Sequence, residues 1–134
     1  MTGWVGNIEA STLQNSNFRT VLFTAASLQL TVMCLQPGED IGLEMHDHLD
    51  QFIRVEAGQG RVTVGPSEDE VEATHELSDD WAVVIPGGTW HNVINAGSEP
   101  LRLYSLYSPP EHAAGAVHAT KADAEAAEAA HHGH

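Results

Sequence analysis

The sequence predicts a single all-β domain, a sandwich or a barrel, and three observations support this fold class. Short segments rich in β-branched and large apolar residues recur along most of the 134-residue chain, as expected for strands. Glycine and proline separate these segments at regular intervals, which is typical of all-β folds. The strand–helix–strand alternation of a parallel sheet is not visible. A chain of this length can bury one hydrophobic core.

The expected strands follow one another from residue 18 to residue 108. The clearest alternation is in QFIRVEAG, where Ile53 and Val55 alternate with polar or aromatic neighbours, which is the period of a strand. PGED at 37–40 predicts a turn, because proline presets one dihedral and glycine supplies the next. The predicted strands are 18–23, 27–35, 51–58, 61–65, 81–86, 91–96 and 101–108.

Two segments do not follow this pattern. Residues 66–80 are acidic and poorly periodic, and we expect a solvated hairpin tip at 68–70 with a short strand around Val71 and Ala73. Residues 121–130 have high helix propensity but almost no large apolar side chain to bury, so a short helix or a disordered tail is expected, followed by an unstructured HHGH end. We therefore expect a barrel domain over 1–112 and an Ala/Glu/His-rich tail over 113–134.

The charge balance limits the possible partners. The formal net charge is −14 with only five lysines and arginines, so the surface repels phosphate backbones and anionic membranes. The single Cys34 cannot form an internal disulfide and is expected to be buried and inert. No signal peptide opens the chain, and no apolar run approaches the roughly 18 residues of a membrane helix. A cytoplasmic protein that binds neither nucleic acid nor membrane is expected.

Residues 44–51, EMHDHLDQ, contain the residue types of a metal site. Side chains two positions apart on a strand share a face, which permits Glu44 with His46 or His46 with His48. Periodicity alone does not choose between these pairs.

Two stretches of the chain resemble the two motifs of the cupin superfamily. The first motif runs Gly, five residues, His, one residue, His, three or four residues, Glu, six residues, Gly, and the stretch from Gly38 to Gly58 fits it with Glu44, His46 and Gln51 at the ligand positions. Placing His46 and His48 on the histidine positions would put Phe52 or Ile53 at the acidic position. The second motif matches from Pro86 through His91 to Asn95, although the glycine that leads it is replaced by Asp80.

The resemblance implies a double-stranded β-helix, a jelly-roll barrel with a metal in its mouth. It implies four ligands: Glu44, His46, Gln51 and His91. Two imidazole nitrogens and two oxygens suit a divalent transition metal (Mn, Fe, Co, Ni, Cu or Zn) better than calcium. Compared with three histidines and one glutamate in most cupins, one histidine has become Glu44 and the glutamate has become Gln51.

The function that follows is a metal-dependent enzyme on a small polar organic molecule, with isomerase- or oxygenase-type chemistry and the metal as Lewis acid. Catalytic residues are not assigned, although Glu44 or a pocket tyrosine, Tyr104 or Tyr107, is a candidate base. A phosphosugar isomerase is disfavoured unless an arginine enters the pocket. The alternatives are a non-catalytic ligand-binding or sensing cupin with a structural metal, and a metal-free scaffold. A homodimer is expected, with Trp90 and Ile94 as candidate outward residues.

Overall fold

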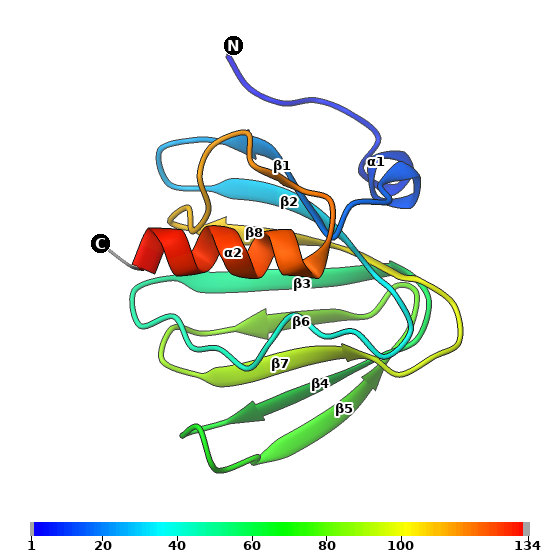
Figure 1. The fold of residues 1–134 in the computed structure, drawn as a ribbon, viewed down its shortest axis with the longest axis vertical. Coiled ribbons are helices and arrows are strands. Elements are labelled where there is room, and N and C mark those ends of the chain that lie inside the picture. The colour runs from blue at the N-terminus through cyan, green and yellow to red at the C-terminus, as the bar shows by residue number, and fades with distance from the viewer. Residues whose placement is uncertain (1, 133–134) are drawn as a thin grey trace.

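The computed structural model describes residues 2–132, and its strands form two antiparallel sheets facing each other in a jelly-roll barrel (Figure 1). In this part of the chain, the larger sheet has the order β6-β3-β8-β2-β1-β9 and the smaller has the order β5-β4-β7. The larger sheet comprises β1 (Arg19–Thr24), β2 (Gln29–Leu35), β3 (Asp50–Ala57), β6 (Ala82–Ile85), β8 (Leu101–Ser108) and β9 (Val117–His118). The smaller comprises β4 (Gly60–Gly65), β5 (Ala73–Leu77) and β7 (Trp90–Asn95).

The seven strands predicted from the sequence are all present, each within two residues of its expected bounds. The acidic segment 66–80 contributes β5, which begins at Ala73 and pairs with β4, and its tip closes through a bridge between Ser67 and Glu70. Cys34 is buried with a free thiol, as expected. Among the residues described, no helix is long and apolar enough to cross a membrane.

Two elements were not expected. The short helix α1 (Ile8–Gln14) begins after Asn7, whose side-chain oxygen accepts a hydrogen bond from the backbone N–H of Ala10 at 3.0 Å. The strand β9 has two residues and pairs with β1 through Arg19↔His118 and Thr20↔Val117. Seven and two residues are too few for a periodic pattern, so both elements depend on the packing around them.

The hydrophobic core lies between the two sheets. Along β8, Leu101, Leu103, Ser105 and Tyr107 are buried while the residues between them are partly exposed. The cluster of packed apolar residues includes Leu101 and Leu103 but not Tyr107, so the same face of β8 passes from an apolar half of the barrel into a polar half. Each large apolar side chain that is fully buried contributes about 1.5–3 kcal/mol. The core members with at most 1% exposure include Leu35, Ile53, Val55, Val62, Val93, Leu101 and Leu103.

The C-terminal segment packs on the barrel through α2 (Lys121–His132), which crosses the front of the molecule in Figure 1. Ala124 is 3% exposed and belongs to the core cluster, so a helix without large apolar residues docks through a small side chain. Lys121 forms an ion pair with Asp40. The helix bears out the helical alternative expected for this segment; Gly133 and His134 of the HHGH end lie outside the described residues. The boundary at residue 112 between the barrel domain and the tail stays a prediction.

The turn before β6 has a backbone conformation that favours glycine. Asp80, which stands where the cupin motif has glycine, has a φ of 75°, a left-handed conformation that glycine adopts at less cost. Its carboxylate contacts Arg54 at 2.6 Å. The motif residue Gly58 also has a positive φ, and a Cβ there would lie 2.6 Å from the carbonyl oxygen of Pro100.

Candidate metal centre

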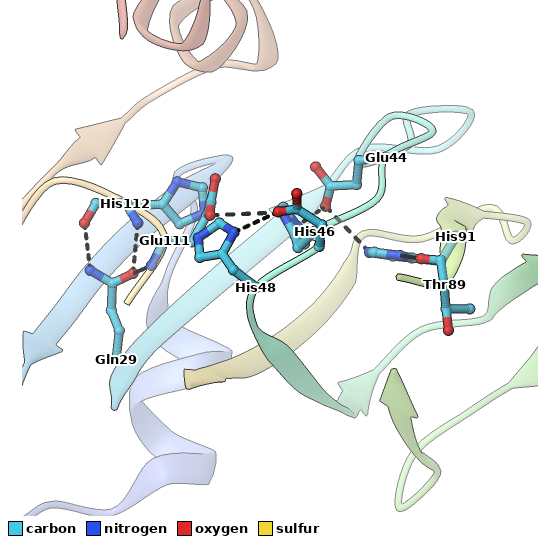
Figure 2. A network of polar contacts seen from close by, with 9 residues as sticks. Gln29, Glu44, His46, His48, Thr89, His91, Glu111 and His112 are labelled. Atoms are coloured by element: carbon cyan, nitrogen blue, oxygen red, sulfur yellow. Dashed lines mark hydrogen bonds and ion pairs between the residues drawn. The ribbon is translucent and has the colours of Figure 1, made fainter. Parts of the chain in front are cut away.

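Three predicted ligands, Glu44, His46 and His91, lie together in the polar half of the barrel (Figure 2). Glu44 and His91 are directly opposite each other in an antiparallel bridge, and each backbone N–H donates to the other's carbonyl oxygen at 2.9 Å. Directly opposed residues point to the same face. His46 is two positions after Glu44, so an extended backbone turns it to that face as well. The backbone pairing therefore brings the three side chains together.

The potential ligand atoms of these three residues all lie within 4.8 Å of one another. Glu44 Oε1 is 3.4 Å from His46 Nε2 and 3.5 Å from His91 Nε2. Burial favours the neutral carboxyl, but the two neighbouring imidazoles of His46 and His91 outweigh it and lower the pKa of Glu44 to about 2. Glu44 is therefore an anion at neutral pH, as a carboxylate ligand must be.

A backbone carbonyl fixes the orientation of the His91 ring. Its Nδ1 lies 2.9 Å from the carbonyl oxygen of Thr89, and because a carbonyl can only accept, Nδ1 carries the proton. Nε2 then faces Glu44 with its lone pair available, which is how an imidazole coordinates a metal. The side chain is 1% exposed, and Nε2 has no hydrogen-bond partner among the described residues.

His46 lies between two carboxylates. Its Nε2 faces Glu44, and its Nδ1 is 3.7 Å from Glu111 Oε2. Burial lowers its pKa, but the contact with Glu44 and the charges of Glu44 and Glu111 outweigh burial and raise the pKa above its ordinary value. Nε2 of His46 is also buried without a hydrogen-bond partner in the described part of the chain.

Gln51, the fourth predicted ligand, is buried on β3 of the larger sheet. It is 3% exposed, and it is paired across β3 and β8 with Tyr107, whose ring centroid is 6.3 Å from that of His46. Its Oε1 has no hydrogen-bond partner among the residues described. Buried polar atoms are normally paired, so the unpaired amide oxygen of Gln51 and the unpaired imidazole nitrogens of His46 and His91 fit a bound cation.

The alternative pair, His46 with His48, is not brought together. The His48 side chain is 63% exposed, and its Nδ1 lies 2.9 Å from Asp47 Oδ1. Asp50 Oδ1 accepts a hydrogen bond from the backbone N–H of Gly87 at 2.8 Å, which ties the loop after β6 to the start of β3. Asp50 therefore positions the loop that leads to His91, and His48 faces solvent.

The sequence motifs did not identify a second group beside the cluster, formed by Gln29, Glu111 and His112 (Figure 2). Gln29 is fully buried; its Oε1 accepts from the backbone N–H groups of Glu111 and His112 at 3.1 and 2.9 Å, and its Nε2 donates to His112 O at 2.7 Å. These bonds hold Glu111 next to His46. In the sequence, this group is marked by the polar pair Glu111 and His112, which follows β8 closely and lies outside both cupin motifs.

Tyr107 connects the two groups. Its ring lies edge-on to His112 at 5.1 Å and near His46, and burial raises the pKa of its hydroxyl above the ordinary value. It therefore stays a protonated phenol over the physiological range. The sequence left packing and pocket roles open for this residue, and the structure places it both in the interior and beside the cluster.

The fold is that of a cupin. A family model described as Cupin domain matches residues 31–107, and the chain belongs to this family. The uncharacterized protein YrkC of Bacillus subtilis is 54% identical over 93% of this chain and 67% of its own length. The uncharacterized protein L612 of Acanthamoeba polyphaga mimivirus is 39% identical over 85% of this chain and 70% of its own. The crystal structure of BH2720 from Bacillus halodurans, 55% identical, superposes with a TM-score of 0.91 over 92% of this chain and 94% of that one.

Proposed function

We propose that the chain is a metal-dependent enzyme acting on a small polar organic molecule, with Glu44, His46, Gln51 and His91 holding a divalent transition metal. One observation carries the proposal: the side chains of His46, Gln51 and His91 each have a buried ligand atom without a hydrogen-bond partner among the described residues. Two imidazoles, one carboxylate and one amide oxygen suit Mn, Fe, Co, Ni, Cu or Zn. The absence of cysteine from the set disfavours a closed structural zinc site.

Each residue has a separate task in this proposal. The metal would supply Lewis acidity toward a carbonyl or enediol oxygen. Thr89 O holds the tautomer of His91, and Glu44 balances part of the cation's charge. The low pKa of Glu44 makes it a weak base, and the raised pKa of Tyr107 makes it a hydrogen-bond donor. Glu111, held by Gln29 and bordering a cavity of about 230 Å³, is the carboxylate best placed to accept a proton.

A non-catalytic role, binding or sensing a small ligand around a structural metal, is the second candidate. The observation that favours it is the cover over the neighbouring cavity, whose walls include Ala127 and Glu128 of α2. A ligand there would be enclosed on one side by a helix. Isomerase- or oxygenase-type turnover of a candidate substrate by the metal-loaded protein favours the first role; stoichiometric binding without turnover favours the second.

Metal content tests the ligand assignment. In a background with His131→Ser, His132→Ser and His134→Ser, which removes the tail histidines without cutting α2 from the core, we expect near-stoichiometric divalent metal by elemental analysis. His91→Ala should lose it, because an imidazole ligand is removed. His48→Ala is the matched control and should retain it. Equal loss in both variants, or no metal in the background protein after loading, would refute the assignment.

Two further expectations from the sequence are kept as proposals. We propose that the protein acts in the cytoplasm and forms a homodimer. Trp90 and Ile94 are each partly buried within the protomer. Light scattering at two protein concentrations measures the oligomeric state, and a constant monomer mass would contradict the dimer.

A further inference from the structure

A cavity of about 230 Å³ lies between α2 and the segment that follows β8, and two histidines line it. Its walls include Glu111, His112 and His118 and, from α2, Ala127 and Glu128. Nε2 of His112 and Nδ1 of His118 are buried, and neither has a hydrogen-bond partner among the described residues. Buried polar atoms are normally paired, so a molecule that bonded to both nitrogens would recover free energy that folding leaves unused.

The backbone around both histidines is held in place. Gln29 Oε1 accepts a hydrogen bond from the backbone N–H of His112 at 2.9 Å, and Gln29 Nε2 donates to the carbonyl oxygen of His112 at 2.7 Å. The His112 ring packs edge-on against Tyr107 at 5.1 Å. His118 lies on β9, directly opposite Arg19 of β1. A ligand would therefore find both imidazoles on ordered backbone, which lowers the entropy cost of binding.

These side chains do not form a second metal site. In the part of the chain that the structure describes, the candidate metal centre is the one place where three histidine, cysteine or carboxylate ligand atoms lie within 4.8 Å of one another. Glu111, His112 and His118 are too far apart for this, so they do not share one ion as ligands. An extended molecule with several polar groups fits their spacing better.

The electrostatics of the cavity favour an uncharged molecule. Burial, and after it the nearby charge of Arg19, lower the pKa of His112 to about 3 and also lower that of His118. Both rings are therefore neutral, and the same burial and charge disfavour an organic cation in contact with them. An anion is disfavoured because the Glu111 carboxylate lines the cavity, whereas none of its described lining residues is an arginine or a lysine. Arg19 itself borders a separate cavity of about 170 Å³.

We propose that this cavity binds a small uncharged polyol, with hydroxyl groups paired to Nε2 of His112 and Nδ1 of His118. A hydroxyl group both donates and accepts, so it pairs with a neutral imidazole nitrogen whether or not that nitrogen carries the proton. The carbon chain would pack against Ala113, Ala116 and Ala127, the small apolar side chains of the cavity wall. A purely apolar molecule would leave both nitrogens unpaired.

The cavity borders the candidate metal centre through Glu111, whose Oε2 is 3.7 Å from His46 Nδ1. A further hydroxyl group paired with Glu111 would therefore lie next to a predicted metal ligand. The inference deepens the proposed function by naming a substrate class, and it rests on that function only in calling the polyol a substrate. Binding itself requires no metal, so the two proposals can fail separately.

Binding is measured on the full chain, both as purified and after removal of metal with a chelator. The probes are three neutral polyols, glycerol, erythritol and xylitol, and three charged analogues of glycerol: glycerate, glycerol 3-phosphate and 3-amino-1,2-propanediol. Saturation-transfer NMR at constant ionic strength gives a saturable signal for a specific site. We expect saturable binding of at least one polyol, and at least about tenfold weaker binding of every charged analogue, because a charge would lose its hydration in the cavity.

Single substitutions locate the site. His112→Leu and His118→Leu each remove one imidazole and should weaken polyol binding about tenfold, because a buried hydrogen bond is lost. Circular dichroism checks that the variants fold. His118→Gln, which keeps a polar group at this position, should weaken binding less than leucine and replaces the leucine variants if they do not fold. His75→Leu, at an exposed position on β5, is the matched control and should leave binding unchanged.

Two more variants separate this proposal from the metal assignment. Glu111→Gln removes the negative charge from the cavity wall, so glycerate should bind about threefold or more tightly than it does to the parent. His91→Ala, which is expected to lose metal, should still bind the polyol. His118→Leu should keep the metal content of the parent.

Weaker polyol binding in both leucine variants, with retention in His75→Leu, supports the site even if the parent holds no metal. Three results would overturn it whatever the metal content: no saturable binding of any of the three polyols, equal binding by the parent and both leucine variants, or a charged analogue that binds as tightly as the best polyol.

Discussion

The buried amide of Gln51 has a cost to folding that metal binding would recover. Its Oε1 is paired with no donor in the described structure, and an unsatisfied buried polar group costs about 1–3 kcal/mol. In the metal-free protein, Gln51→Leu should therefore raise the free energy of unfolding by about 1 kcal/mol. The same variant should bind divalent metal at least about tenfold more weakly, because a ligand is lost.

Denaturant unfolding and metal titration measure the two effects separately. Gln51→Glu is the control, since it keeps an oxygen at this position and adds a negative charge, so metal affinity should be retained or increased. Unchanged affinity in Gln51→Leu would remove Gln51 from the ligand set and leave Glu44, His46 and His91.

Asp80 is a second residue whose conformation has a cost to folding. A left-handed residue other than glycine costs roughly 1–2 kcal/mol, and Asp80 has a φ of 75°. Asp80→Gly and Asp80→Ala both remove the contact with Arg54, so the comparison between them isolates the backbone effect. We expect Asp80→Gly to be more stable than Asp80→Ala by about 1 kcal/mol in urea unfolding. Equal stability would show that the turn relaxes around alanine.

At the scale of elements, the contact between Asp40 and Lys121 joins α2 to the loop before Glu44. Asp40→Asn should weaken docking of α2, with amide exchange in the helix faster by up to about fivefold, because a partly exposed ion pair contributes at most about 1 kcal/mol. Hydrogen exchange followed by mass spectrometry measures this. Glu125→Gln is the matched control, because the Glu125 side chain is 67% exposed and 4.0 Å from Lys121.

The pH dependence of this contact has a definite sign. Burial raises the pKa of Asp40, but the hydrogen bonds from Asn92 and Lys121 outweigh burial, and the pKa lies below its ordinary value. A carboxyl group whose pKa is lowered on folding stabilises the fold above its unfolded pKa of about 3.9 and loses this contribution as pH falls through the folded value. Docking of α2 should therefore be unchanged between pH 7 and 5. Weaker protection of the α2 amides already at pH 5, measured relative to their intrinsic exchange rates, would contradict the role of Asp40.

The sequence predicted the long strands, and three of the four predicted ligands lie together in the structure, but the elements around them were not predicted. Alternation in β3 and β8 and the turns between strands carry strong local signals, and the motif spacing selects Glu44 over His48. The strand β9 has no such signal, because its two residues become a strand only by pairing with β1. Glu111 lies beside His46 because Gln29, 82 residues away in the chain, holds its backbone. A contact at that separation has no local pattern.

At the scale of the whole molecule, the net charge of −14 opposes compaction. Raising the salt concentration from about 10 to 150 mM shortens the range of this repulsion to about 8 Å. We expect the metal-free protein to gain about 1 kcal/mol, which corresponds to roughly 3–6 °C in melting temperature for a domain of this size. Sodium and potassium chloride should act alike, since screening depends on ionic strength. A fall in melting temperature, or a difference between the two salts, would point to specific ion binding instead.

The paired backbone between Glu44 and His91 limits how this protein can change over evolutionary time. Exchanging the side chain at either position leaves the peptide bonds, and hence the direction of the Cβ, as they were, so glutamate can stand at a position where the first cupin motif has histidine. Deleting a single residue between Glu44 and His46 would instead turn the imidazole to the opposite side of the chain. A substitution at Glu44 or His91 can therefore change the donor atom without changing its direction, whereas a change in spacing cannot.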